Sequence, residues 1–417
     1  MADFDHTTEH HARIWRETFA QARQTCPVLH SDNHGGYYVV TRHADVMSVL
    51  ADPETYSSER SWDENGDDVH LSATIPLTPV RVGFLDMDSP EHTTYRKPLN
   101  GWSTRQAVTR GRARIAQIAR WAVDQVIEQG RCDVVFELAS PFQVVMFLDL
   151  IGIPIEHWPE FARVAHKIHG STDPADRPAG LRWLQEELGA EIVRQRATRS
   201  DGLLGQIARA ESGGELLALD TATELAVMLL LGGELTTIAT ICHFIEYLYR
   251  HADERSRLRA DPSAMPTAVD EILRYFSPSI GIARAVTRPA SLSGQELYPG
   301  DRLLLSYASA NLDEAVFGHA DQVDLCRRPN PHLAFGKGIH RCIGAQLAHA
   351  NVELLVSEVL RRIPDYIVTS SGPFERIPTV NAYHEMRIEF MPGPRSGAEG
   401  AGHIPVLTGE RVCPLGG

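Results

Sequence analysis

One cysteine stands in a segment whose residue types are suited to hold a metal. Cys342 lies in "HLAFGKGIHRCIGAQLAHANVELL", where a glycine-rich stretch gives way to apolar residues with helical spacing. A helix N-terminus offers unpaired N–H groups and a positive dipole end, and both favour the thiolate that binds metals. Gly336 and Gly338 would let the loop backbone curl close to the sulfur. Structural zinc needs four ligands, whereas haem iron has four porphyrin nitrogens, so a lone thiolate suits haem.

Two adjacent glycines lie inside a long apolar segment with helical spacing, about residues 224–248. In "VMLLLGGELTTIAT", Gly232 and Gly233 precede Thr236 and Thr237. Each glycine inside a helix lowers the stability of the helix by about 1 kcal/mol relative to alanine, so a structural or functional requirement should explain the pair. Either the helix packs tightly against a neighbouring helix, or a flat, bulky group lies against its backbone.

Bulk composition excludes several classes of protein. The chain has 417 residues and a net charge of −14, which argues against a nucleic-acid partner. The N-terminal "MADFDHTTEHHARIWRETFAQARQ" lacks the apolar core of a signal peptide, and Glu234 interrupts the longest apolar run. The six cysteines are scattered, without a Cys-x-x-Cys pair. We therefore expect a soluble cytoplasmic protein with reduced thiols.

Helical periodicity dominates the chain. Helices are expected at 8–24, 42–51, 91–129, 137–151, 157–169, 180–198, 219–250, 266–276 and 343–362. Strand-like segments are short and fall at 35–41, 302–306 and 387–391. The expected fold is mainly α with small peripheral β-sheets, as one domain over 1–395 followed by a flexible tail at 396–417.

The residues around Cys342 resemble a known signature. They match, in order and spacing, the haem-binding segment of the cytochrome P450 family: Phe335, Gly336, Gly338, His340, Cys342 and Gly344. The resemblance extends over about residues 10–392. It implies the cytochrome P450 fold, a haem b cofactor (iron protoporphyrin IX) and Cys342 as the protein's ligand to the iron. Phe335, Gly336, His340 and Gly344 would then contact the haem.

Two further motifs resemble parts of the same family. Glu271 and Arg274, in "DEILRYFSP", have the i, i+3 spacing that allows a bidentate pair, as in the family's Glu-x-x-Arg helix. There the buried pair holds the loop that carries the cysteine. The resemblance also assigns cationic side chains to the two haem propionates: His92, Arg96, Arg284 and His340.

The segment with the paired glycines resembles the family's central helix, which crosses the distal face of the haem. Gly232 and Gly233 would let this helix lie close to the porphyrin. In the family, a threonine preceded by a carboxylate guides protons during dioxygen activation. Thr236 resembles that threonine, but Leu235 precedes it and the acid is Glu234. At about 100° per residue, Glu234 lies roughly 200° from Thr236 and should face away, unless a bulge rotates it.

Three consequences of this departure remain open. Protons could pass through water and Thr236, Thr237 or Thr240, or polar groups of the substrate could complete the path. The enzyme could also run chemistry that depends less on ordinary dioxygen scission. Thr236, Thr237 and Glu234 are the candidate catalytic residues.

Family analogy indicates where substrate and electrons would arrive. Substrate contacts are expected from Leu229, Gly233, Ile280, Ile282 and Val380, with a plain core position as the alternative for each. The haem domain consumes the length of the chain and leaves no flavin or ferredoxin segment. We therefore expect electrons from a separate ferredoxin and ferredoxin reductase. The docking face would be basic, with Arg341 and Lys337 and additional charge from Arg110, Arg112 and Arg114.

The leading hypothesis is a bacterial-type haem-thiolate monooxygenase. It would hydroxylate or otherwise oxidise a small organic molecule in a biosynthetic tailoring pathway. An alternative keeps the haem but catalyses oxidative coupling, a peroxide-driven reaction or a rearrangement, and Leu235 in place of the acid is its cue. A non-catalytic haem sensor is a third possibility, but a sensor would not need Thr236 and the glycines.

Overall fold

The structure is a computed structural model that describes residues 4–62, 68–70, 73–76, 81–171, 173, 175–198, 202–373 and 380–396. Backbone contacts divide the chain into two compact units. Unit 1 comprises Met1–Lys97, Thr267–Ala345 and Phe374–Asn381, and unit 2 comprises Pro98–Pro266, Gln346–Pro373 and Ala382–Gly417. The expected single domain stays a prediction, and all but the first residue of the expected tail lies outside the described part of the chain.

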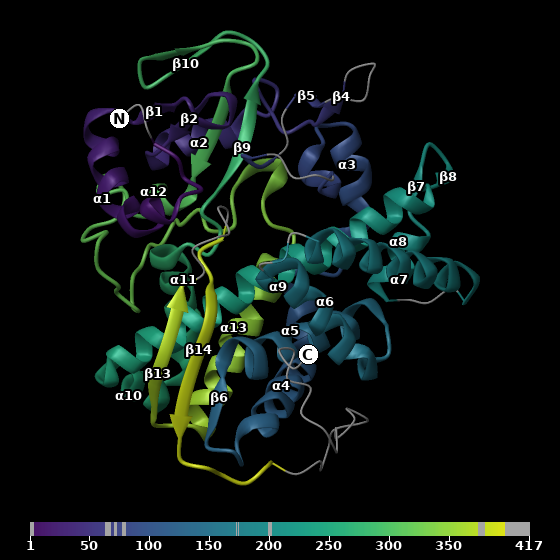
Figure 1. Cartoon of the computed structure of the whole chain (residues 1–417), viewed down its shortest axis with the longest axis vertical. Helices are drawn as coiled ribbons and strands as arrows, with labels where there is room; N and C mark the ends of the chain where they lie inside the picture. The colour runs from purple at the N-terminus through teal and green to yellow at the C-terminus, as the bar shows by residue number, and fades with distance from the viewer. Residues whose placement is uncertain are drawn as a thin grey trace. The chain divides into compact units, whose positions relative to one another are not determined.

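Unit 1 is built around a five-stranded sheet with strand order β1-β2-β12-β9-β3. Its strands are β1 (Val28–Ser31), β2 (Tyr37–Val40), β12 (Arg302–Ser306), β9 (Gly281–Val286) and β3 (Tyr56–Ser57). Strand β12 pairs in parallel with β2 and antiparallel with β9, so segments far apart in sequence meet at the sheet centre (Figure 1). Two small hairpins are β4 (Ser61–Trp62) with β5 (Asp68–His70), and β10 (Ala290–Leu292) with β11 (Gln295–Leu297).

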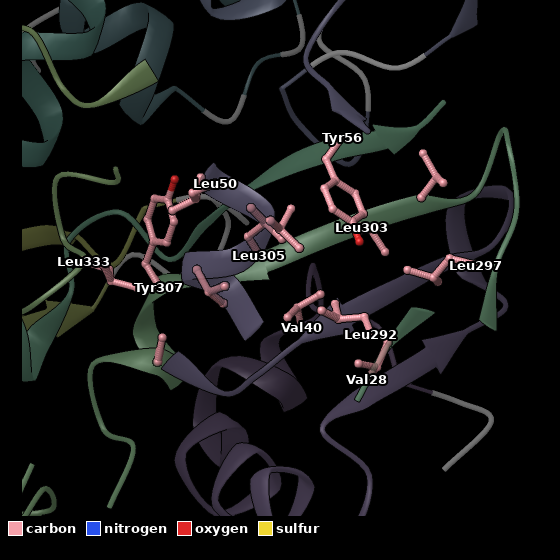
Figure 2. Packing of buried hydrophobic residues seen from close by; sticks show 14 residues of the cluster. Val28, Val40, Leu50, Tyr56, Leu292, Leu297, Leu303, Leu305, Tyr307 and Leu333 are labelled. Atoms are coloured by element: carbon pink, nitrogen blue, oxygen red, sulfur yellow. The ribbon is translucent and has the colours of Figure 1, made fainter. Parts of the chain in front are cut away.

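The helices of unit 1 are α1 (Glu9–Thr25), α2 (His43–Ala51), α3 (Glu91–Arg96), α12 (Tyr307–Ala310) and α11 (Met265–Phe276, from Thr267 onward). Alternate residues of the central strands enter two different cores, because strand side chains point to opposite faces. Leu303 and Leu305 join one buried cluster with Val40, while Leu304 joins the other with Val39. Figure 2 shows the first cluster, which also contains Leu50 and Tyr307.

Unit 2 is mainly helical. Its helices are α4 (Arg105–Val126), α5 (Ser140–Ile151), α6 (Trp158–Gly170), α7 (Asp176–Thr198), α8 (Leu203–Ala208), α9 (Leu219–Arg250), α10 (Ala252–Ala260) and α13 (Ala345–Arg362, from Gln346 onward). Helix α9 contacts α5, α7 and α8. A sheet in the order β13-β14-β6 joins Tyr366–Pro373, Tyr383–Phe390 and Arg131–Asp133, and the hairpin β7–β8 joins Glu211–Ser212 to Glu215–Leu216 (Figure 1).

The expected mainly α fold with small sheets is confirmed, with one helix assigned wrongly. The segment expected as a helix over 91–129 is divided into α3 and α4. Pro98 and Gly101 lie between them, and the Thr104 side chain caps α4 by accepting from the Ala107 N–H. Helices α8 and α10 and strand β9 were not expected. Helix α10 has Leu258 as its buried residue, so it shows no apolar period, and α8 is too short to show one.

Two helical stretches, Val134–Ile151 and Leu219–Arg250, are long and apolar enough to cross a membrane. However, 72% and 61% of their apolar windows are buried inside the protein. Core helices of a protein have this property, because their apolar residues face other helices rather than lipid.

Candidate active site

The loop before Cys342 has a backbone that depends on glycine. Gly336 and Gly338 have φ of +62° and +70°, a region that L side chains rarely adopt. A Cβ on Gly338 would lie 2.3 Å from the Leu50 carbonyl oxygen, and one on Gly336 would lie 3.0 Å from the Tyr307 hydroxyl. Leu50 and Tyr307 belong to the core cluster of Figure 2, so the cysteine loop rests directly on the core of unit 1.

Cys342 itself has accessible surface, although many protein atoms surround its sulfur. Burial raises the pKa of the Cys342 thiol, while a hydrogen bond from the Gly344 N–H and the charges of Arg96 and Arg341 lower it. The hydrogen bond to the sulfur therefore comes from the Gly344 N–H, whereas Gly336 and Gly338 shape the loop. A metal that binds here must displace the thiol proton.

The Glu271–Arg274 pair forms on α11 and is fully buried. Two guanidinium nitrogens of Arg274 each lie 2.8 Å from a carboxylate oxygen of Glu271, and both side chains are 0% exposed. Arg274 also donates to the carbonyl oxygens of Asn311, Ala320 and Gln322. Glu271 accepts from the side chains of Arg327 and Asn330 and from the Asp324 N–H. The pair thereby fixes the segment that leads into the cysteine loop.

Four cationic or potentially cationic side chains gather near Cys342 in unit 1. The rings of His92 and His340 lie 4.4 Å apart, and Arg96 donates to the carbonyl oxygen of Arg341 at a separation of 2.5 Å. Arg284 is buried and donates to the Ala283 carbonyl oxygen.

Several nitrogens of this group lack partners. Among the residues that the structure describes, both ring nitrogens of His92 and of His340 are buried without a hydrogen-bond partner, as is Nη1 of Arg96. Burial and neighbouring positive charge lower the pKa of His92 to about 4 and that of His340 to about 2. Burial also lowers the pKa of Arg96 and of Arg284. Such a group is incomplete without an anion, because buried donors and charges need acceptors.

The glycine pair of α9 borders open space. Among the described residues, a Cβ on Gly232 or on Gly233 would meet no atom within 4 Å, apart from the chain neighbours and the helix's own nearby backbone. Tight packing against a neighbouring helix therefore does not explain this pair. Thr236 donates to the Gly232 carbonyl oxygen at 3.1 Å, and Thr237 donates to that of Gly233 at 2.8 Å. Hydroxyls that bond back to the helix in this way loosen a turn locally.

The Glu234 side chain points away from Thr236 and toward α5. Its carboxyl is buried with Oε1 3.4 Å from the hydroxyl of Ser140 on α5. This agrees with the angular argument from the sequence, and no bulge rotates the side chain toward Thr236. Glu234 can therefore influence the open side of α9 only indirectly. The half-buried Thr236 remains a candidate for direct contact, whereas Thr237 is buried.

The other expected residues divide into two groups. Leu229 and Ile280 are half-buried, and Val380 pairs with Ser279 through an isolated bridge. Ile282, in contrast, packs against the core cluster of Figure 2, the plain core position that was the alternative for it.

The expected basic residues are not all available for docking. Arg112 forms a bidentate pair with Glu353, and Arg114 pairs with Asp149. These partners were missed because their positions follow from helix packing in unit 2, not from local sequence. The exposed members are Lys337 and Arg341 in unit 1 and Arg110 in unit 2.

The candidate site combines the Cys342 thiol with buried nitrogens that have no hydrogen-bond partner among the described residues. Comparisons with known proteins show which family has such a site. The family model described as Cytochrome P450 matches residues 132–363. A steroid C26-monooxygenase of Mycobacterium tuberculosis is 32% identical over 93% of this chain and 96% of its own length. Another, from Mycolicibacterium smegmatis, is 30% identical over 90% of this chain and 93% of its own length.

Solved structures show the same likeness. A cytochrome P450 of Mycobacterium marinum, CYP268A2, in complex with pseudoionone superposes with a TM-score of 0.82 and 28% sequence identity. The match covers 91% of this chain and 95% of that one. The chain belongs to the cytochrome P450 family, and it is a haem-iron oxidoreductase of the monooxygenase type.

The residues present fit a haem. Two propionates would bond to nitrogens of His92, His340 and Arg96 that have no partner in the described part of the chain. Cys342, a residue with accessible surface, would supply the one ligand that a porphyrin iron needs from the protein.

Proposed function

We propose that this protein binds haem b through Cys342 and hydroxylates a small, largely apolar organic molecule. The observation that carries the proposal is the partly exposed Cys342 beside buried nitrogens that have no hydrogen-bond partner among the described residues. Relatives named for steroid oxidation and a similar structure solved with pseudoionone favour a steroid-like or terpenoid-like substrate. A tailoring step in biosynthesis is part of the proposal and rests on the family resemblance alone.

Haem, when bound, supplies the activation of dioxygen and the transfer of one oxygen atom to the substrate. The protein's residues would do the rest. Cys342 would donate electron density to the iron, tempered by the Gly344 N–H and the positive charge of Arg96. His92, Arg96, Arg284 and His340 would hold the propionates.

By the family resemblance, α9 would supply the groups on the oxygen side of the haem. Thr236 and Thr237 would hold water and pass protons at their hydroxyl oxygens, since no carboxylate directly precedes Thr236. Gly232 and Gly233 would leave room for the haem, and Leu229, Ile280 and Val380 would contact the substrate. Leu235 in place of an acid also keeps a peroxide-driven reaction as the second candidate.

We further propose a ferredoxin and a ferredoxin reductase as electron donors and the cytoplasm as the location. Exposed Lys337 and Arg341 lie close in sequence to Cys342 and would attract an acidic ferredoxin. The two long apolar helices are mostly buried in protein, which supports a location away from membranes.

The absorption spectrum of the reduced carbon monoxide complex tests this proposal. The haem-loaded wild type should show the red-shifted band of thiolate ligation, and Cys342→Ser should lose it. Cys326→Ser is the control, because Cys326 is an exposed cysteine elsewhere in unit 1 and should keep the band. Turnover of a steroid and terpenoid panel with ferredoxin and reductase, compared with peroxide alone, separates the two candidate reactions. A Cys342→Ser variant with an unchanged band would refute the assignment.

A further inference from the structure

A buried polar group lies on the α5 side of α9 and has no part in the proposed haem site. It comprises Ser140 and Gln143 on α5, Glu234 on α9 and Asn351 on α13, and we name it the amide cluster. Figure 1 labels these three helices. All four residues are buried, Asn351 completely. Because buried polar groups need hydrogen-bond partners, the direction of each bond in the cluster can be derived.

The assignment of donors and acceptors starts from a backbone carbonyl, which can only accept. The Gly233 oxygen can only accept, so Gln143 presents its Nε2 to it at 3.0 Å. Gln143 Oε1 then faces Asn351, whose Nδ2 donates at 3.1 Å. Asn351 Oδ1 is left over as an acceptor, and no described residue donates to it. The chain of hydrogen bonds from α9 to α13 therefore ends in an oxygen that needs a hydrogen-bond donor.

Glu234 presents a second unmatched oxygen. Its Oε1 lies 3.4 Å from the Ser140 hydroxyl, while its Oε2 has no partner in the part of the chain that the structure describes. Ser140 and Gln143 are neighbours on one face of α5, and Glu234 follows Gly233, so the two unmatched oxygens belong to one small region. Two oxygens satisfy each other only if a proton lies between them, on the carboxyl or on a bridging water.

The environment favours a proton on the carboxyl. Burial raises the pKa of Glu234 to about 8, and the Ser140 hydroxyl opposes this shift. Among the described residues, neither α5 nor α13 nor any other element presents a charged or titratable side chain that shifts this pKa. An ionised Glu234 would thus be a buried charge without a counterion.

We propose that the amide cluster is a proton-dependent switch that sets the hydrogen bonding of the Gly233 carbonyl. With Glu234 protonated, its O–H donates to Asn351 Oδ1, directly or through one water, and the chain through Gln143 to Gly233 is complete. With Glu234 ionised, the carboxylate attracts the Asn351 NH₂ group instead. Both amides then turn over, and Gln143 presents an oxygen to the Gly233 oxygen. Their repulsion releases the carbonyl.

The switch acts on the part of α9 that the proposed reaction uses. The Gly233 carbonyl also accepts from Thr237, and the space beside Gly233 is open. Gln143 and Asn351 are therefore positioning residues, and Glu234 is the group that titrates. The switch itself does not depend on the proposed function, but its effect on the reaction does.

Infrared spectroscopy of the haem-loaded protein tests the protonation state. The wild type should show a carboxylic acid C=O band at pH 6 that disappears with a midpoint near 8, and Glu234→Gln should lack it. Glu246→Gln is the matched control on α9. Burial alone would raise the pKa of Glu246, but hydrogen bonds from Tyr383 and Arg250 hold it below its usual value, so this variant keeps the band. A wild type whose band at pH 6 survives Glu234→Gln overturns the proposal.

Hydrogen exchange in a peptide spanning residues 230–240 tests the switch. Wild-type protection factors, which correct for intrinsic rates, should fall several-fold between pH 6 and 9. Glu234→Gln should stay protected at both pH values, because its amide still donates to Asn351 Oδ1. Gln143→Leu should be weakly protected at both, and Glu246→Gln should follow the wild type. A fall that persists in Glu234→Gln contradicts the switch. Neither measurement uses turnover, so failure of the proposed function would leave both results interpretable.

Discussion

At the scale of single residues, the buried ionisable groups of this protein are of two kinds: those with hydrogen-bond and charge partners and those without them. Glu271 and Arg274 neutralise each other within 2.8 Å and fill their remaining hydrogen-bonding capacity from the surrounding loop. His92 and His340 have no such partners among the described residues, and we propose that haem propionates bind to them. A complete pair serves stability, whereas an incomplete group of donors indicates a binding site.

Glu271→Gln should strongly destabilise the protein. The change leaves Arg274 buried without its carboxylate, which costs about 3–5 kcal/mol in the free energy of unfolding. Urea unfolding measures this loss. Glu160→Gln is the control, since Glu160 pairs with Arg163 at the same i, i+3 spacing but both side chains are 48% exposed. It should change stability by less than about 0.5 kcal/mol, and equal losses in the two variants would contradict the argument.

Glu234→Gln should stabilise the protein increasingly as pH rises. The folded pKa of Glu234 is about 8, above its ordinary value of 4.5. The unfolded chain therefore releases this proton first. The stabilising contribution of the protonated form is complete below pH 4.5 and is lost as pH rises through about 8. Each unit of pKa difference corresponds to about 1.4 kcal/mol.

Urea unfolding at pH 5.5 and pH 8 measures this prediction. The advantage of Glu234→Gln over the wild type should be larger at pH 8. Glu246→Gln should show the opposite trend, because its folded pKa is lowered and its stabilising charge is present above its unfolded pKa. Parallel trends in the two variants would show that the assignment of Glu234 is wrong.

At the scale of elements, α9 shows why a helix can retain glycines at an apparent cost. The open space beside Gly232 and Gly233 means that no neighbouring helix requires them. On the opposite side, Gln143 and Ser140 of α5 contact the same turn. One turn of α9 therefore has an open face and a polar, buried face, and the two faces carry different functions.

Gly232→Ala should stabilise the haem-free protein by up to about 1 kcal/mol, because alanine has the higher helix propensity and its methyl group meets nothing. In the haem-loaded protein the same methyl should weaken the spectral response to substrate. Thermal unfolding and substrate titration measure the two effects. Gly180→Ala on α7 should destabilise instead, since its Cβ would lie 2.7 Å from Ile168 Cγ1. Destabilisation of the haem-free Gly232→Ala protein would be evidence against open space.

At the scale of the whole molecule, charge determines which partners can approach. The net charge of −14 repels acidic partners in general, so a ferredoxin needs locally exposed cations. Pairing removes Arg112 and Arg114 from that role, because each charge is compensated within unit 2. Lys337 and Arg341 are exposed in unit 1 and remain.

Lys337→Glu should slow reduction by a ferredoxin severalfold at low ionic strength, and the difference should shrink as salt is added. Stopped-flow reduction over a salt series measures this. Arg112→Gln is the comparison variant, and its main effect should be on stability, since it leaves Glu353 partly buried without its partner. If Lys337→Glu matched the wild type at low salt, this residue would have no part in docking.

Local pattern predicted the elements and motifs that depend on near neighbours. The i, i+3 spacing of Glu271 and Arg274 predicted their pair, and the angular offset of Glu234 from Thr236 predicted that their side chains diverge. Local pattern could not predict contacts between segments that are far apart in the sequence. Examples are Glu353 opposite Arg112 and Asn351 opposite Gln143, whose side chains meet only after the helices have packed.

Residue type and spacing along the chain were enough to predict Cys342 as the iron ligand, the glycine-dependent loop before it and the family. The surroundings of these features came from the folded structure. Within the described residues, the paired glycines border open space, the nitrogens of His92 and His340 have no hydrogen-bond partner, and Glu234 is buried against Ser140. Burial and partnership are properties of folded neighbours, and those neighbours come from segments far apart in the chain.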